Sequence, residues 1–178
     1  MNIEQLKRKV IDCRKCDRLV QFREKIALEK RKAYSNWEYW GKPVPGFGSE
    51  NAKIMVLGLA PAAHGGNRTG RVFTGDRSAD FLFRCLYHVG LSNQASSEHR
   101  NDGLKLEGFI TTAVKCVPPG DKPTPKEKEN CEVFLNKEFE MLENIKVVLG
   151  LGKIGFDSYL KYVRKKYPIK MKDHKFGH

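Results

Sequence analysis

The stretch Gly58-Leu-Ala-Pro-Ala-Ala-His-Gly-Gly-Asn-Arg-Thr-Gly-Arg-Val-Phe-Thr-Gly-Asp76 separates two segments with different hydrophobic patterns. The run before it, Lys53-Ile-Met-Val-Leu57, is typical of a buried strand. The run after it, from Ala79 to Val89, has its apolar residues at helical spacing. The stretch is therefore a long loop at the carboxyl end of a strand, where open α/β sheets bind their ligands. We predict an α/β fold with its binding site in this loop.

The composition of the loop fits a ligand site. Its five glycines allow the backbone to approach a ligand closely, and a loop of this length in a compact domain is usually functional or disordered. Its apolar and aromatic residues argue against disorder, although a flexible surface loop is the plain alternative. The chemically useful side chains are two arginines for phosphates, one flat aromatic face and three polar groups: Arg68, Arg71, Phe73, His64, Asn67 and Asp76.

Length and charge limit the classes of protein. The 178 residues suffice for one domain, 1–178, and the 33 basic against 21 acidic residues give a net charge of +12. Such an excess predicts a polyanionic partner, either nucleic acid or an anionic membrane surface, unless it serves only solubility. We find no apolar run near the ~20 residues of a membrane span and no signal peptide. We expect a cytoplasmic protein without a membrane partner, in which clustered cysteines bind metal or take part in catalysis.

Two further strands and several helices complete the expected sheet. Residues 108–114 and 145–149 are rich in β-branched residues and predict a second and a third strand. Helices are expected over residues 2–12, 17–33 and 78–89, and from Thr124-Pro125 onward, where Thr124 and Glu127 form a capping-box pattern. Asn2 and Asp17 are the expected caps of the first two helices. The sequence thus predicts a mainly parallel three-stranded sheet flanked by helices.

Two other motifs have a structural and a functional interpretation. The segment 37–48 is expected to be a loop, and its four aromatic residues either stack on unpaired bases or, as we favour, cover an edge of the core. Gly150-Leu-Gly-Lys-Ile-Gly155 has the spacing of a dinucleotide-binding turn. That interpretation needs a further strand with an acidic end, and Asp173 lies in a basic tail instead. Tight packing of a helix on a strand is the favoured explanation.

The cysteines predict a metal centre. Cys13 and Cys16 form a CxxC unit, which presents two thiolates to one metal or serves as a redox dithiol. Cys116 follows the second strand and Cys131 lies near the start of the next helix, so these two are expected to lie close together. Cys85 falls on the predicted apolar face of the helix over residues 78–89, together with Phe81, Leu82, Leu86 and Val89, and is expected to be buried as a small hydrophobe. From chemistry alone, the other four thiolates suit zinc.

The loop from Gly58 to Asp76 closely resembles the first active-site motif of the family 5 uracil-DNA glycosylases, iron–sulfur enzymes of archaea and some bacteria. The resemblance implies a three-layer uracil-DNA glycosylase-like fold with four sheet strands in a complete member. It implies a monofunctional enzyme that hydrolyses the N-glycosidic bond of uracil in DNA, with hypoxanthine and other deaminated bases as further candidates. It also implies a 4Fe–4S cluster on Cys13, Cys16, Cys116 and Cys131, which would tie residues 1–50 to the sheet.

The resemblance also implies roles for the loop residues. Phe73 matches the phenylalanine that stacks on the extruded base, and Asp76 matches the carboxylate that stabilises the sugar cation or positions water. We expect the backbone from Gly58 through Ala60 to Ala63 to contact the base, and His64 and Asn67 to read the base or orient water. Arg68 and Arg71 would hold phosphates or order the loop. Asp121 would add a polar contact, at a position where the family tends to carry Asn.

The chain departs from the family pattern in two ways. Leu59 and Thr112 occupy positions where the related family 4 enzymes carry an acid and an Asn, which leaves the water-activating group open. The H-P-S-type motif that follows the F-G-H run in the family is not found in the sequence, so truncation is one expectation. A catalytically impaired iron–sulfur DNA-binding module is therefore the alternative function, and a nucleotide-binding enzyme using Gly150–Gly155 is the third. We expect a monomer in a prokaryotic cytoplasm, associated with the nucleoid.

Overall fold

A computed structural model describes residues 1–177 of the chain. Its centre is a four-stranded sheet in the order β1-β3-β2-β4. The strands are β1 (Phe47–Gly48), β2 (Ile54–Gly58), β3 (Phe109–Thr112) and β4 (Val147–Gly150). The pairs β2–β3 and β2–β4 are parallel, which confirms the expected α/β fold.

The prediction that residues 37–48 form only a loop was wrong at β1. Phe47 and Gly48 were expected to lie in a loop, but they pair antiparallel with Ile110 and Phe109. The pairing is close because a Cβ atom on Gly48 would lie 2.1 Å from the carbonyl oxygen of Gly108. Local turn signals predicted a loop here, whereas the partner strand more than 60 residues away makes a short strand.

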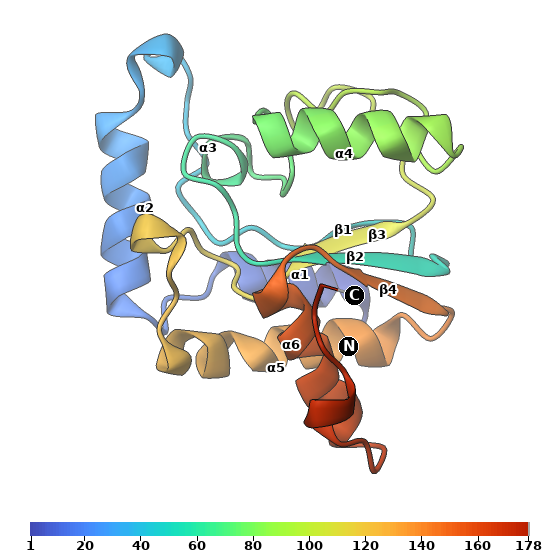
Figure 1. Cartoon of the computed structure of the whole chain (residues 1–178). Coiled ribbons are helices and arrows are strands. Elements are labelled where there is room, and N and C mark those ends of the chain that lie inside the picture. The colour runs from blue at the N-terminus through green and yellow to red at the C-terminus, as the bar shows by residue number, and fades with distance from the viewer. Residues whose placement is uncertain (178) are drawn as a thin grey trace.

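Helices cover the sheet on both faces (Figure 1). The helix α4 (Arg77–His88) lies on one face, and α1 (Ile3–Ile11), α5 (Pro125–Met141) and α6 (Lys153–Arg164) lie on the other. The helix α2 (Asp17–Glu29) stands beside the sheet, next to the short α3 (Gly66–Thr69). The described residues also contain three 3-10 turns: η1 (Lys32–Tyr34), η2 (Pro119–Asp121) and η3 (Met171–Asp173).

Alternation along the strands builds the two cores. Val56 and Ile110 face α4 and pack with Phe83, whereas Met55 and Phe109 face the other helices and pack with α1 and α5. Successive side chains of a strand point to opposite faces, so each central strand is apolar on both sides. This two-sided core holds the carboxyl ends of β2 and β3 in register, and the loops that follow them start side by side.

Local sequence signals set most helix starts. Asn2 and Gln5 form a capping box at α1, and Thr124 and Glu127 form the one predicted at α5. Asp76 caps α4 by accepting a hydrogen bond from the amide of Ala79. At α2 the prediction was off by one residue, because Cys16 is the cap residue and the helix begins at Asp17.

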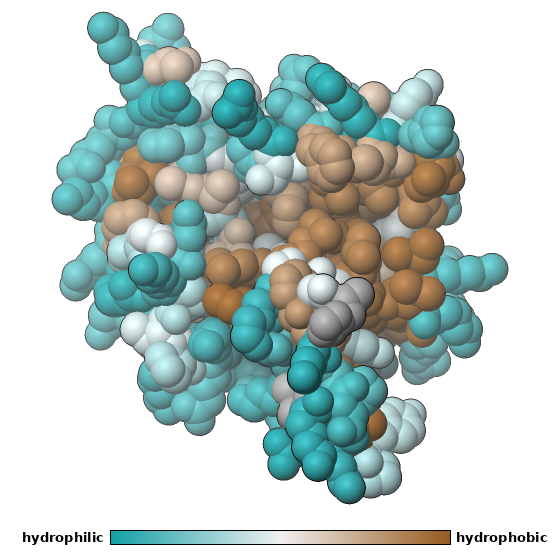
Figure 2. All heavy atoms as spheres, viewed as in Figure 1, coloured by the Kyte–Doolittle hydropathy of each residue, from teal (hydrophilic) through white to brown (hydrophobic). Residues whose placement is uncertain are grey.

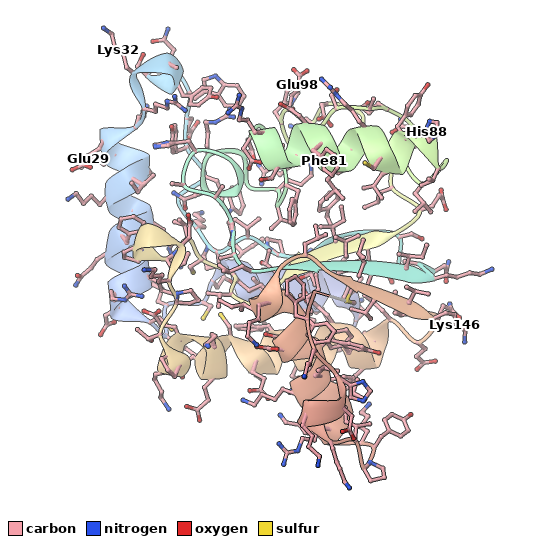
Figure 3. The ribbon with its side chains drawn as sticks, in the orientation of Figure 1. Glu29, Lys32, Phe81, His88, Glu98 and Lys146 are labelled. Atoms are coloured by element: carbon pink, nitrogen blue, oxygen red, sulfur yellow. The ribbon has the colours of Figure 1, made fainter. Side chains whose placement is uncertain are left out.

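A second prediction, that Cys85 is buried on the apolar face of α4, was wrong. Leu82 and Leu86 are buried as expected, but Cys85 is exposed, and so are Phe81 and Val89. The buried face turns instead toward Ala79 and Phe83, which leaves a second apolar stripe on the helix. Figure 2 shows this apolar surface continuing from α4 toward β4, and Figure 3 shows Phe81 on the helix.

The glycines between β4 and α6 serve close packing. A Cβ atom on Gly155 would lie 2.3 Å from the carbonyl oxygen of Leu57, so α6 approaches β2 backbone to backbone. Asp173 lies in a 3-10 turn, where a dinucleotide site would need a strand. Among the helices of residues 1–177, we find none long and apolar enough to span a membrane.

Candidate active site and cysteine cavity

A cleft of about 820 Å³ lies at the carboxyl edge of the sheet. The loop after β2, the start of α4 and η2 after β3 contribute to its wall, so the topology joins segments far apart in sequence. The predicted site residues His64, Arg68, Asp76 and Asp121 all line it. Residues from the segment 31–37, which sequence reasoning did not assign to the site, complete one side: Arg31, Tyr34 and Trp37.

Asp76 is a carboxylate of the cleft whose position is fixed by the protein. Its Oδ1 accepts a hydrogen bond from the Ala79 amide at 3.0 Å, so the helix start fixes the side chain. Burial raises the pKa of Asp76, against the lowering effect of the Ala79 and Ser78 amides. A fixed, partly desolvated carboxylate in a cleft is a candidate catalytic group.

His64 lies on the same wall. Its Nδ1 pairs with the hydroxyl of Tyr39 at 2.9 Å, which fixes the ring. Burial lowers the pKa of His64, and the charges of Arg31 and Arg68 lower it further. The imidazole is therefore neutral at pH 7, and its Nε2 is available to one hydrogen-bonding partner.

Arg68 is engaged by the protein itself. Its guanidinium donates to the carbonyl oxygens of His64 at 2.6 Å and Gly75 at 2.9 Å. It also lies 3.9 Å from the ring centre of Tyr34 and 4.1 Å from that of Trp37. These contacts favour the ordering of the loop over phosphate binding, because Arg68 is 3% exposed and its guanidinium is held between two loop carbonyls and two aromatic rings.

Arg71 is buried below the loop. Its guanidinium contacts both carboxylate oxygens of Asp102, at 3.0 and 2.6 Å, and donates to Ser97 and Thr74. Burial alone would raise the pKa of Asp102, but hydrogen bonds from Arg71 and from the amides of Glu98 and Leu104 hold it at about 2. Arg71 thus anchors the segment 97–102 under the loop and is not among the residues that line the cleft.

Asn67 is also buried away from the cleft. It is 1% exposed, and its Nδ2 donates to the carbonyl oxygen of Arg23 at 3.1 Å. The contact joins α3 to α2. The expected role in base reading or water orientation would need Asn67 to turn from this partner, so the geometry favours a role in loop positioning.

Phe73 and Gly58 contact each other and are not among the residues that line the cleft. A Cβ atom on Gly58 would lie 2.8 Å from Phe73 Cζ, so the phenylalanine ring lies directly against the end of β2. Ala60, two residues on, packs toward the cysteines. Phe73 and Asp121 have φ angles of 48° and 56°, and among the described residues only Lys30 joins them as a non-glycine residue with positive φ. Such strain is concentrated at functional sites.

The segment 37–48 matches the favoured interpretation only in part. Tyr39 is 8% exposed, and Trp40 and Phe47 pack on the core, as expected of residues that cover its edge. Trp37 is 36% exposed on the rim of the cleft. The signal that could have placed it was the neighbouring basic run, since exposed aromatics among basic residues are typical of nucleic-acid surfaces.

Four cysteines line one cavity between α2, α5 and the end of β3. Cys13, Cys16, Cys116 and Cys131 surround it together with Arg23 and Phe134, and Figure 3 shows sulfur atoms gathered near these elements. Burial raises the pKa of Cys116 to about 11 and that of Cys131 to about 12. In residues 1–177, no three His, Cys, Asp or Glu side chains are grouped closely enough to bind a single metal ion.

Comparisons of the sequence with known proteins show the family to which the chain is similar. The model of the uracil DNA glycosylase superfamily matches residues 45–176. The type-5 uracil-DNA glycosylase of Pyrobaculum aerophilum is 47% identical over 154 residues, which are 86% of this chain and 67% of that protein. That of Thermus thermophilus is 42% identical over 93% of this chain and 74% of its own length. That of Mycobacterium bovis is 46% identical over 84% of this chain.

The chain spans 56% of the length of the Mycobacterium bovis protein. The matched region contains β2, the whole loop with Asp76, and the cleft from His64 to Asp121. It therefore includes the sheet and most of the cleft, whereas the cleft residues Arg31, Tyr34 and Trp37 and the CxxC unit lie before it. The chain belongs to the uracil-DNA glycosylase superfamily, and its relatives at 42–47% identity are type-5 uracil-DNA glycosylases.

Proposed function

We propose that this chain hydrolyses the N-glycosidic bond of uracil in DNA as a repair glycosylase, and that it also accepts other deaminated bases such as hypoxanthine. The observation that carries the proposal is the convergence of Asp76, His64 and Asp121 on one cleft at the carboxyl edge of the sheet. These residues come from the loops that follow the neighbouring parallel strands β2 and β3.

The first requirement of the reaction is an extruded base, because the bond is inaccessible inside the stack. Phe73, beside Gly58 at the end of β2, would offer its ring to such a base, which must then pass beyond the residues that line the cleft, because Phe73 packs against the core and is not among them. The backbone from Gly58 to Ala63 offers amides and carbonyls to its edge. His64, neutral and held by Tyr39, donates or accepts a hydrogen bond beside it.

The second requirement is the management of charge. The sugar gains positive charge as the uracil anion departs, and a preorganised carboxylate stabilises that charge without reorganisation. Asp76 is held for this role by the amide at the start of α4. As the base leaves, the same carboxylate accepts a proton or a hydrogen bond from the attacking water. Asp121 contributes a second polar group from the opposite loop.

DNA as the partner is supported by charge. The net charge of +12 favours a polyanion, and basic side chains with an exposed tryptophan lie along the cleft: Arg31, Arg77 and Trp37. Contacts to phosphates hold the strand, while stacking tolerates any base sequence. The proposal places a monomer on chromosomal DNA in a prokaryotic cytoplasm.

We also propose that the four-cysteine cavity holds a 4Fe–4S cluster. Zinc is the alternative, but as a single ion it would need the thiols to move closer together than they are in residues 1–177. The donor set fits, because four thiols from three distant segments line one cavity beside a buried arginine. The group would supply a covalent link between the N-terminal helices and the sheet. None of the proposed steps on the base or the sugar involves it.

The test is the release of uracil from a duplex of defined sequence, followed by alkali cleavage and a gel. Asp76→Asn should lower the single-turnover rate roughly 100-fold or more, as expected for the loss of an electrostatic group. Glu143→Gln, an exposed change at the opposite edge of the sheet, alters net charge equally and should leave the rate unchanged. DNA binding without any cleavage by the wild-type chain would instead favour the impaired DNA-binding module.

A further inference from the structure

Arg23 is a charged residue in the interior of the protein. It lies in the middle of α2 and is 2% exposed. A buried guanidinium is costly unless it is paired and hydrogen-bonded. Its Nη1 reaches the sulfur of Cys116 at 3.0 Å and the carbonyl oxygen of Cys13 at 3.3 Å, so it points into the four-cysteine cavity.

The protein offers Arg23 little compensation. Among residues 1–177, its Nε is the one buried side-chain nitrogen or oxygen without a hydrogen-bond partner. The nearest carboxylate, Glu24, lies 4.0 Å away, is half exposed, and has Arg14 as its close partner at 2.5 Å. The arginine charge is therefore almost unpaired in the protein alone.

A metal group bound by four thiolates would change that balance. Four thiolates carry more negative charge than the positive charge of a zinc ion or a cubane cluster, so the complete site is negative. A cation at hydrogen-bond distance from one of its sulfurs stabilises such a site and raises its reduction potential. The unpaired charge of Arg23 and the charge of the site are then complementary.

The backbone of the same residue reaches the catalytic loop. The carbonyl oxygen of Arg23 accepts a hydrogen bond from Nδ2 of Asn67 in α3. The backbone amide of Asn67 donates to the carbonyl oxygen of Ala62, a residue in the wall of the cleft. Asn67 is 1% exposed and has no other side-chain hydrogen bond in the described structure. One residue thus contacts the cysteine cavity with its side chain and the loop with its backbone.

We propose that Arg23 is the buried counter-charge of the metal group held by the four cysteines and the residue through which that group positions the loop of α3. The inference rests on the metal group of the proposed function. It assigns to that group a role in the active site that needs no chemistry at the group itself. Arg23 is a positioning residue, since it touches neither base nor sugar.

The experiment compares Arg23→Met and Arg23→Lys with the wild-type chain, in the absence of DNA. The methionine removes the charge at similar length, and the lysine keeps the charge but loses the planar fork. Iron and sulfide are quantified over time in excess chelator, and the midpoint potential is measured by voltammetry. Circular dichroism checks the fold of each variant.

We expect Arg23→Met to lose iron roughly 10- to 100-fold faster than wild type, the usual effect of removing a group that supports metal ligands. Its potential should move to a more negative value, and Arg23→Lys should retain a potential near that of wild type. A folded Arg23→Met with unchanged iron retention and potential overturns the inference. If Arg23→Met does not fold, Arg23→Lys decides. Iron loss and a potential equal to those of wild type support the charge role of Arg23. A more negative potential in Arg23→Lys overturns it.

A second variant tests the link to the loop. Asn67→Ala removes the hydrogen bond to the Arg23 carbonyl and leaves the arginine side chain in place. We expect unchanged iron retention with faster proteolysis or hydrogen exchange of residues 62–70. Unchanged protection of this segment overturns the positioning role. A wild-type chain that carries no iron at all overturns the cofactor proposal and this inference, while uracil release remains a separate test of the proposed reaction.

Discussion

A Cβ atom on Gly65 would lie 2.1 Å from Oδ2 of Asp76. The backbone at the start of α3 therefore lies directly against the carboxylate that caps α4, and no other residue fits at position 65 while Asp76 keeps its rotamer. The glycine in the loop is thus a steric condition for the position of the proposed catalytic group. The carbonyl oxygen of Thr74, 3.1 Å from the same Cβ position, limits the space on the other side.

Gly65→Ala should consequently displace the Asp76 side chain and lower the rate of uracil release about 10- to 100-fold, since small misplacements of a catalytic group have large effects. The clash meets the end of a side chain, so the protein should fold. The rate is measured alone and in an Asp76→Asn background. Because the two residues act through one group, the alanine should have little further effect there. Fully additive losses would show that Gly65 acts on something other than Asp76.

Asp76→Asn should separate activity from stability. Burial raises the pKa of Asp76, so folding favours its protonated form, and the ionised form costs stability at pH values above the folded pKa. Asparagine caps a helix as well as aspartate does. We therefore expect the variant to lose activity and to be as stable as wild type or up to about 1 kcal/mol more stable at pH 7. Urea unfolding at pH 7 measures this, with Asp76→Ala as the control that loses the cap and about 1 kcal/mol.

The same pKa direction predicts the pH profile of the reaction. The carboxylate form is the active one, so the rate should fall as the pH drops through a value above the 3.8 of an ordinary aspartate. The single-turnover rate on uracil-containing DNA, measured at constant ionic strength, gives the position of this limb. A limb at or below pH 3.8, or one that persists in Asp76→Asn, would assign the titration to another group.

Asp102 should stabilise the fold in a different pH range. Its folded pKa of about 2 lies below its ordinary value of 3.8, so its contribution is complete above about pH 4 and is lost as the pH falls toward 2. Asp102→Asn leaves the buried Arg71 guanidinium without its charge partner and should cost about 3 kcal/mol at pH 7. The exposed pair Lys126–Glu129 provides the control, because Glu129→Gln should change the free energy of unfolding by less than about 0.5 kcal/mol.

How much the sequence revealed depended on whether the information was local. The cap at Asn2, the capping box at Thr124 and the apolar runs of β2, β3 and β4 lie within short segments, and all were predicted. Tyr34 and Trp37, whose rings lie against the guanidinium of Arg68, are some 30 residues away in sequence, and only folding brings them together. The same holds for the strand at Phe47.

The prediction that Cys85 is buried was wrong for another reason. The apolar residues of α4 form two stripes, and the helical period does not say which stripe faces the sheet. Phe83, absent from the predicted face, is buried, whereas Phe81 is 75% exposed. The choice between them depends on Val56 and Ile110 below the helix, which no local pattern contains.

Binding of the metal group should require the CxxC unit. Cys13→Ala with Cys16→Ala removes two of four thiolates, so purified protein should contain almost no iron, and helices α1 and α2 should become protease-sensitive. Cys85→Ala is the matched control, because Cys85 is exposed on α4 and does not line the cavity. Iron at the wild-type level in the double variant would refute the ligand assignment, and zinc in place of iron in the wild-type chain would select the alternative metal.

Trp37 should contribute to DNA binding and not to the chemical step. It is exposed on the rim of the cleft, and Arg68, its stacking partner, is also held by Tyr34 and by two carbonyl oxygens. Trp37→Ala should therefore leave the loop ordered and weaken binding of uracil-containing DNA about 5- to 100-fold, the range for loss of one base-stacking aromatic. Binding by fluorescence anisotropy and single-turnover rates at saturating protein separate the two effects. Trp37→Phe keeps a flat face and should recover most of the affinity. A loss confined to the saturated rate would instead mean that Trp37 acts through Arg68 on the catalytic loop.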